Sequence, residues 1–139
     1  MLAEDDENDV LLIRRAFTVA GIRNPLVVAR NGEEAIAMLK GQSPALFADP
    51  CLLITDIKMP KVDGFELLVW LQNEPRFGSL TKLVISSSIL EHDLARSLML
   101  AATAYFIKPN NHSALVDLVR IWKEKFLSDG EANLSRVRT

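Results

Sequence analysis

The segment LLITDIKMPKVDG, residues 52–64, decides the fold. Its first residues form a short and almost wholly apolar run, which is typical of a central parallel strand buried on both faces. The run stops at Asp56, and Pro60 cannot take part in a hydrogen-bonded ladder, so the strand must end before it. We therefore expect Asp56 at the carboxyl end of a central strand, which is the edge where open α/β sheets bind ligands.

Short apolar segments and helical patterns alternate along the rest of the chain. Strands are expected at residues 1–3, 26–29, 51–55, 81–85 and 103–107. Helices are expected over 8–20, from Asn31 to near Gly41, from Asp63 to Glu74, from Ser88 to Ala101, and from Asn110 or Asn111 to Phe126. Three of these helices begin with capping-box pairs, namely Asn31 with Glu34, Asp63 with Glu66, and Ser88 with Glu91. This alternation predicts an α/β fold, a five-stranded parallel sheet with helices on both faces.

Composition limits the class of protein. The 139 residues, 49% of them hydrophobic, predict one domain over residues 1–127 and a polar tail over 128–139. A formal net charge of −2 argues against binding nucleic acid or a membrane surface, and no apolar run reaches the roughly 18 residues of a spanning helix. The single cysteine, Cys51, excludes an internal disulfide and is expected to be buried. These features predict a soluble cytoplasmic domain, whose very short first strand is either a stub or lacks upstream residues.

Polar side chains occur where each predicted strand ends. They are Glu4, Asp5 and Asp6 after the first strand, Asp56 after the third, Ser86 and Ser87 after the fourth, and Lys108 after the fifth. Because the strands are parallel, all of these ends lie on one edge of the sheet. Clustered carboxylates repel one another unless a cation neutralises them, and ligands that are all oxygen suit Mg²⁺. The sequence therefore predicts a magnesium site.

This set of residues suits phosphoryl transfer. A carboxylate beside the metal ion can act as a nucleophile and become an aspartyl phosphate. Transfer depends mainly on positioning and on neutralising oxygen charge, which the ammonium of Lys108 and the hydroxyl of Ser86 would assist. Asp56 is the expected nucleophile. The alternative for Asp56 is a helix cap at a strand end, and the alternative for Lys108 is a solvated lysine.

Over roughly residues 1–127 the chain resembles the receiver domain of two-component response regulators. The matching positions are Glu4-Asp5, Asp56 within TDIKMP, Asp63-Gly64, Ser86, Tyr105 and Lys108-Pro109. The resemblance implies a flavodoxin-like doubly wound sheet in the order 2-1-3-4-5. It also implies a protein that catalyses only its own phosphorylation and dephosphorylation. The chain looks most similar to small single-domain receivers, some of which serve phytochrome-type kinases.

The resemblance also implies a role for each matching residue. Asp56 would accept a phosphoryl group from a histidine kinase or a phosphotransfer protein, with Ser86 and Tyr105 as switch residues. Mg²⁺ would be bound by Asp5, by Asp56, by Glu4 through a water, and by the backbone carbonyl of Lys58. The Lys108–Pro109 peptide bond would be cis. The signal would leave by protein contacts through the fourth helix, fifth strand and fifth helix, to a downstream protein or a second copy of the chain in a homodimer.

Several alternatives stay open from the sequence. Glu4 and Asp5 could be no more than an acidic turn before a helix, and Tyr105 could be an ordinary half-buried aromatic residue. The rival functions are a haloacid-dehalogenase-type phosphatase, a binding-only adaptor that is never phosphorylated, and a flavin module. The phosphatase would need an Asp-x-Asp pattern on its first strand, which residues 4–7 lack. The flavin module would need a phosphate-binding loop, and no segment resembles one.

Overall fold

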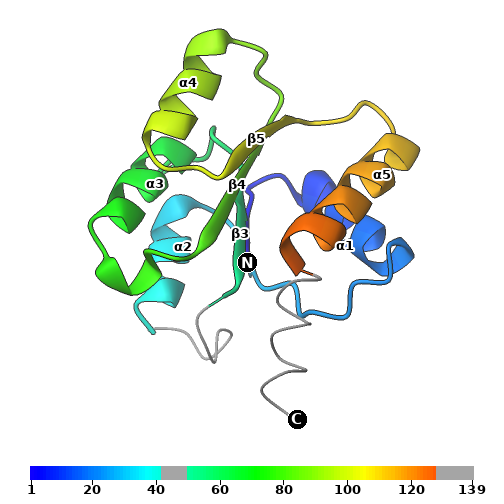
Figure 1. Cartoon of the computed structure of the whole chain (residues 1–139), viewed down its shortest axis with the longest axis horizontal. Helices are drawn as coiled ribbons and strands as arrows, with labels where there is room; N and C mark the ends of the chain where they lie inside the picture. Colours follow the sequence, from blue (N-terminus) through cyan, green and yellow to red (C-terminus); the bar gives the residue numbers. More distant parts are fainter. Residues whose placement is uncertain (42–49, 128–139) are drawn as a thin grey trace.

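A single parallel sheet forms the centre of the molecule (Figure 1). The computed structural model describes residues 1–41 and 50–127. The strands lie in the order β2-β1-β3-β4-β5, and each neighbouring pair is parallel. Their bounds are β1 Leu2–Ala3, β2 Val28–Ala29, β3 Leu52–Thr55, β4 Thr81–Ser86 and β5 Ala104–Ile107. The predicted order 2-1-3-4-5 is confirmed.

Helices cover both faces of this sheet (Figure 1). Their bounds are α1 Glu7–Val19, α2 Gly32–Leu39, α3 Gly64–Gln72, α4 Glu91–Met99 and α5 His112–Trp122, with the short helical turns η1 Pro75–Phe77 and η2 Lys123–Leu127. Helices α1 and α5 pack side by side on one face. Helices α2, α3 and α4 cover the other face. The predicted α/β architecture is therefore confirmed.

The apolar run in β3 is buried on both sides, as its composition predicted. Leu52 and Ile54 belong to the core beneath α1 and α5, whereas Leu53 belongs to the core beneath α2 and α3. Each buried methylene contributes about 0.8 kcal/mol, so both faces of this strand stabilise the sheet. This central position fixes the backbone that carries Asp56.

Side chains cap α1, α2, α3 and α5, but not α4. At α2 only half of the predicted box is present, because Asn31 accepts from the Glu34 N–H and no reciprocal bond from the Glu34 side chain is formed. Asp63 and Glu66 form a complete capping box at α3. At α4 the predicted box is wrong, because the N-cap residue is Leu90 and it makes no side-chain cap. The Ser88 hydroxyl instead donates to Asp93 Oδ2 at 2.5 Å and accepts from the Leu90 N–H. The Ser88 hydroxyl, which the sequence predicted as the helix cap, therefore hydrogen-bonds to Asp93 within the helix.

The structure also bears on the predictions for Cys51, for the tail and for membrane-spanning helices. Cys51 is exposed rather than buried, because the strand begins one residue later at Leu52. Trp122 is fully buried in the core beneath α5, and Phe126 packs against that core. The tail over 128–139 lies outside the described residues. In the described part of the chain, none of the helices has both the length and the apolar character that crossing a membrane would require.

Candidate functional site

The side chain of Lys108 lies at the centre of the carboxyl edge of the sheet. Its ammonium nitrogen is 2.7 Å from Glu4 Oε1, 2.8 Å from Asp9 Oδ2 and 2.9 Å from Asp56 Oδ2. These partners come from the end of β1, the first turn of α1 and the end of β3. Hydrogen bonds that involve an ionised group are stronger than neutral ones, so this group of four side chains ties together the ends of β1, β3 and β5 and the first turn of α1. The predicted convergence of Glu4, Asp56 and Lys108 is therefore confirmed.

Asp56 is held in place by its own backbone surroundings. Its carboxylate is mostly buried, and its Oδ1 accepts a hydrogen bond of 2.7 Å from the Ile57 N–H. The Asp56 N–H donates to the Ala3 carbonyl at 3.0 Å, which extends the β1–β3 ladder to this residue. Oδ1 therefore has a backbone partner, while Oδ2 faces Lys108.

Gly64 allows α3 to begin directly against the end of β3. A Cβ atom at this position would lie 2.1 Å from the Asp56 carbonyl oxygen and 2.9 Å from the Ile57 Cα. The Gly64 N–H donates to the Ile57 carbonyl at 2.7 Å. Gly64, one of the positions that match the family, therefore lets the start of α3 support the backbone of Asp56 at close range.

Three carboxylates lie close enough together to bind one metal ion. Glu4, Asp5 and Asp56 each offer an oxygen atom within 4.8 Å of the others. Glu4 is almost completely buried, whereas Asp5 is exposed and its N–H donates to Glu4 Oε2 at 3.0 Å. A cluster made only of oxygen donors suits a hard divalent cation such as Mg²⁺, which also keeps several waters. The residues present therefore fit the predicted metal.

Burial and charge shift the pKa values of two groups in the site. Burial raises the pKa of Glu4, and the hydrogen bond from Lys108 offsets part of this increase, so that the pKa lies at about 8. Burial alone would lower the pKa of Lys108, but its hydrogen bonds to Asp9, Glu4 and Asp56 raise it well above the ordinary value. The ammonium therefore stays charged over the physiological range, whereas Glu4 becomes ionised only as the pH approaches about 8.

The end of β4 supplies the predicted hydroxyl. Ser86 is buried, its Oγ accepts from the Ser88 N–H at 3.1 Å, and its carbonyl accepts from the Lys108 N–H at 2.8 Å. Asp56 and Ser86 both line a cavity of about 380 Å³, whose other walls come from Lys58 and residues 87–90. Ser86 and Asp56 therefore face the same space, as the sequence predicted. Tyr105 is half-buried, and its hydroxyl donates to the Ser88 carbonyl at 2.8 Å.

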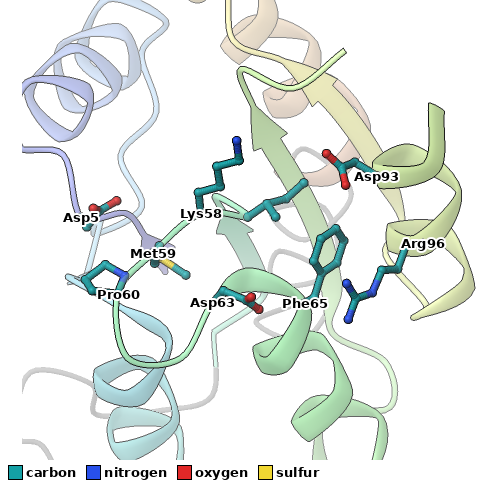
Figure 2. A pocket seen from close by; sticks show the side chains of 9 residues that line it. Asp5, Lys58, Met59, Pro60, Asp63, Phe65, Asp93 and Arg96 are labelled. Atoms are coloured by element: carbon teal, nitrogen blue, oxygen red, sulfur yellow. The ribbon is translucent and has the colours of Figure 1, made fainter. Parts of the chain in front are cut away.

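A second cavity, of about 500 Å³, opens beside the acidic cluster (Figure 2). Figure 2 shows Asp5 at one end of it and Asp93 and Arg96, from α4, at the other. The Arg96 guanidinium stacks over the ring of Phe65, 4.2 Å from its centroid. Lys58 lines both cavities and its side chain is exposed. Its carbonyl, the expected third protein ligand of the metal, stays a prediction.

Two results differ from the sequence analysis. No peptide bond is cis among residues 1–41 and 50–127, so the expected cis bond at Lys108–Pro109 is wrong for this structure. A bond before proline favours trans by about 0.5–1 kcal/mol unless its surroundings select cis. The sequence analysis also missed Asp9. Helical side chains tilt toward the helix N-terminus, so an acid in the first turn of α1 can point back toward the carboxyl edge of the sheet, but its spacing in the sequence does not show that it reaches Lys108.

Comparison with known proteins agrees with this site. Residues 1–120 match the response regulator receiver domain family. The chain is 29% identical over 127 residues to the probable methanogenesis regulatory protein FilR2 of Methanothrix harundinacea, which covers 91% of this chain and 82% of that protein. It is similar to the structure of the phosphorylated cyanobacterial phytochrome response regulator RcpA, with a TM-score of 0.84, 32% identity and 92% of each chain covered. For the Mn²⁺-bound response regulator Rcp1 the TM-score is 0.80, with 28% identity and 91% of each chain covered.

The sheet order, the acidic cluster and the family match all lead to one assignment. Receiver domains are phosphorylated on an aspartate and bind a divalent metal at an acidic pocket, and Glu4, Asp5 and Asp56 form such a pocket here. The fold agrees with the structures of RcpA and Rcp1 over most of the chain. With its family match over residues 1–120, the chain belongs to the response regulator receiver domains.

Proposed function

We propose that this chain is a single-domain response regulator that accepts a phosphoryl group on Asp56 in a Mg²⁺-dependent reaction. The observation that carries the proposal is the 2.9 Å contact between Lys108 Nζ and Asp56 Oδ2 beside the cluster of Glu4, Asp5 and Asp56. The donor would be the phosphohistidine of a histidine kinase or of a phosphotransfer protein. RcpA is a phytochrome response regulator, so a phytochrome-type kinase is the first partner to test.

The proposed step is a displacement at phosphorus. A carboxylate oxygen of Asp56 attacks the phosphorus atom, the P–N bond to the donor imidazole breaks, and the leaving imidazole retains the bonding electrons and takes up a proton. Mg²⁺ would be held by Asp5 and Asp56, by Glu4 through a water and by the Lys58 carbonyl, and when bound it neutralises charge on the phosphoryl oxygens. Lys108 and Ser86 would donate hydrogen bonds to the remaining phosphoryl oxygens.

Receiver domains are signalling proteins rather than enzymes that turn over many substrate molecules. In the proposal the aspartyl phosphate is later hydrolysed, which restores the Asp56 carboxylate and releases inorganic phosphate. The protein would therefore catalyse only its own phosphorylation and dephosphorylation. A phosphatase of the haloacid dehalogenase type would be expected to hydrolyse simple phosphate esters over many cycles.

The contacts around Ser88 suggest how the signal would spread. Its N–H donates to Ser86 Oγ, its carbonyl accepts from the Tyr105 hydroxyl, and its own hydroxyl donates to Asp93 in α4. If a phosphoryl group draws the Ser86 hydroxyl toward Asp56, the first of these bonds must break and residue 88 must move. A change from mostly inactive to mostly active requires about 5 kcal/mol of differential interaction, which a dianion that meets Lys108 and Ser86 can supply.

The α4–β5–α5 region has the surface for a protein contact. Several large apolar side chains on or beside these elements are exposed, namely Ile89, Leu90, Leu94, Leu98, Met99, Ile107 and Ile121. Exposed apolar patches of this kind commonly mark interaction sites. We propose that this surface binds the downstream protein or a second copy of the chain, and that the movement at residue 88 regulates the contact.

Intact mass spectrometry tests the proposal directly. Incubation with acetyl phosphate and MgCl₂ should add the mass of one phosphoryl group to the wild type and none to Asp56→Asn. Asp63→Asn is the matched control, since asparagine also caps a helix and Asp63 lies in the same loop. That variant should still be modified. Unmodified wild type in the presence of bound Mg²⁺, or equal modification of Asp56→Asn, would contradict the proposal. Multiple-turnover hydrolysis of p-nitrophenyl phosphate would favour the phosphatase.

A further inference from the structure

Asp9 contacts Lys108 but is not part of the acidic cluster that would bind the metal. Its Oδ2 lies 2.8 Å from Lys108 Nζ, and its side chain is 32% exposed. Among the described residues, the group that can share a metal ion consists of Glu4, Asp5 and Asp56, without Asp9. Asp9 instead lines two other cavities together with Lys108 and Pro109, one of about 40 Å³ and one of about 790 Å³. Glu4, Asp5 and Asp56 line neither of these two cavities.

The ammonium of Lys108 has no hydrogen left for another partner. An ammonium group carries three N–H donors, and carboxylate oxygens of Glu4, Asp9 and Asp56 are all within hydrogen-bonding distance. A phosphoryl oxygen can therefore bind Lys108 only if one of these bonds is released. When a divalent cation binds, the charges of Glu4 and Asp56 are largely compensated by that cation. Asp9 is then the one of the three carboxylates that still holds Lys108 by a full opposite charge.

We propose that Asp9 is a positioning residue that holds Lys108 in the resting arrangement and opposes its recruitment by the phosphoryl group. The inference rests on the proposed function of Asp56 and deepens it. Asp9 would act through Lys108, by competing with phosphoryl oxygen for the same N–H donor. Its negative charge would also repel the incoming dianion. Removing the Asp9 charge should therefore stabilise the phosphorylated state.

The charge balance predicts opposite effects on the two ligands of the site. Asp9→Asn leaves Lys108 less neutralised, so Mg²⁺ alone should bind more weakly. Beryllofluoride, which mimics the phosphoryl group on a carboxylate, should bind more tightly once Mg²⁺ is saturating. We expect a gain of roughly fivefold, because partly exposed ion pairs contribute up to about 1 kcal/mol. A purely structural defect would weaken both ligands, so the opposite signs are diagnostic.

Glu7→Gln is the matched control. Glu7 lies in the same first turn of α1 and pairs with Arg30 at 3.0 Å, and its side chain is 76% exposed. The control removes the same charge from the same helix end and has the same effect on the helix dipole, without touching Lys108. A second test combines Asp9→Asn with Lys108→Met. If Asp9 acts through Lys108, the gain from Asp9→Asn should largely disappear in the Lys108→Met background.

Isothermal titration calorimetry of the full chain distinguishes the outcomes. Each variant is titrated with MgCl₂, and then with beryllofluoride at saturating MgCl₂. Thermal unfolding verifies that each variant folds. Tighter beryllofluoride binding and weaker Mg²⁺ binding in Asp9→Asn, with Glu7→Gln like wild type, supports the inference. An Asp9→Asn affinity for beryllofluoride equal to that of Glu7→Gln, or weaker than wild type, overturns the inference while the proposed function stands. If wild type with bound Mg²⁺ takes up no beryllofluoride, the proposed function itself fails.

Discussion

Replacing Gly64 with alanine tests how closely the fold supports Asp56. The added Cβ would lie 2.1 Å from the Asp56 carbonyl oxygen and 2.9 Å from the Ile57 Cα. Both neighbours are backbone atoms, so no change of side-chain rotamer can relieve the contact. Real Cβ atoms essentially never approach another heavy atom closer than 3.0 Å, so the start of α3 must move away from the end of β3 by about 0.9 Å.

That displacement sets the size of the effect. Overpacking a core costs about 1–3 kcal/mol, and an immovable backbone neighbour favours the upper half of this range. Alanine is the better helix former, but at most by about 1 kcal/mol. We expect Gly64→Ala to lower the free energy of unfolding by about 2 kcal/mol. For a domain of this size that corresponds to a loss of roughly 4–8 °C in melting temperature.

The assay pairs thermal unfolding with Mg²⁺ titration, because the same displacement should move the Asp56 carboxylate away from Glu4 and Asp5 and weaken metal binding. Gly78→Ala is the control, since its Cβ would lie 3.3 Å from its nearest heavy-atom neighbour, the Pro75 carbonyl oxygen. That contact is tight, but a few tenths of an ångström relieve it. The reasoning would be refuted if Gly64→Ala had the same melting temperature as Gly78→Ala and the same Mg²⁺ affinity as wild type.

Three further perturbations probe the charges and contacts of the site. Lys108→Met leaves Glu4, Asp9 and Asp56 without their shared cation. In urea unfolding it should lower the free energy of unfolding by about 2–4 kcal/mol without Mg²⁺ and by clearly less with saturating Mg²⁺. An equal loss in both conditions would argue against a shared site. The pKa of Glu4 is about 8 in the folded protein and 4.5 when unperturbed. The stability that the protonated Glu4 side chain contributes is therefore lost as the pH rises from 4.5 to about 8. Over the same range the affinity for Mg²⁺ should rise, because the ionised carboxylate is the form that assists metal binding. Glu4→Gln should flatten both pH profiles, and unchanged profiles would assign the titration to another group. Tyr105→Phe removes the hydrogen bond to the Ser88 carbonyl, so it should lower the free energy of unfolding, measured by heat or urea, by about 0.5–1.5 kcal/mol. The variant should still be modified by acetyl phosphate. A loss of modification would place the tyrosine in the transfer step.

The sequence was most informative where topology alone brings residues together. In a parallel sheet the ends of β1, β3 and β5 must share an edge, so Glu4, Asp56 and Lys108 could be placed in one site without coordinates. Ser86 followed from the same argument at the end of β4. The fold order followed from the alternation of strands and helices together with the family resemblance.

The errors occur where a tertiary contact competes with a local pattern. Ser88 and Glu91 have the spacing of a capping box, but Asp93 takes the Ser88 hydroxyl at 2.5 Å. Asp9 was overlooked because its contact with Lys108 depends on how α1 leaves the sheet, and spacing in the sequence does not reveal that angle. The isomer of the Lys108–Pro109 bond is selected by a small free-energy difference, and a motif alone does not fix it.

A crystal structure with Mg²⁺ and beryllofluoride tests the central claim most directly. We predict beryllium bonded to a carboxylate oxygen of Asp56, Mg²⁺ in contact with Asp5 and Asp56, and the Lys108 ammonium and Ser86 hydroxyl donating to fluorine atoms. The claim would be contradicted by beryllofluoride bound away from Asp56. Mg²⁺ without any ligand from Asp5 or Asp56, or Lys108 with no contact to the fluorines, would contradict it equally.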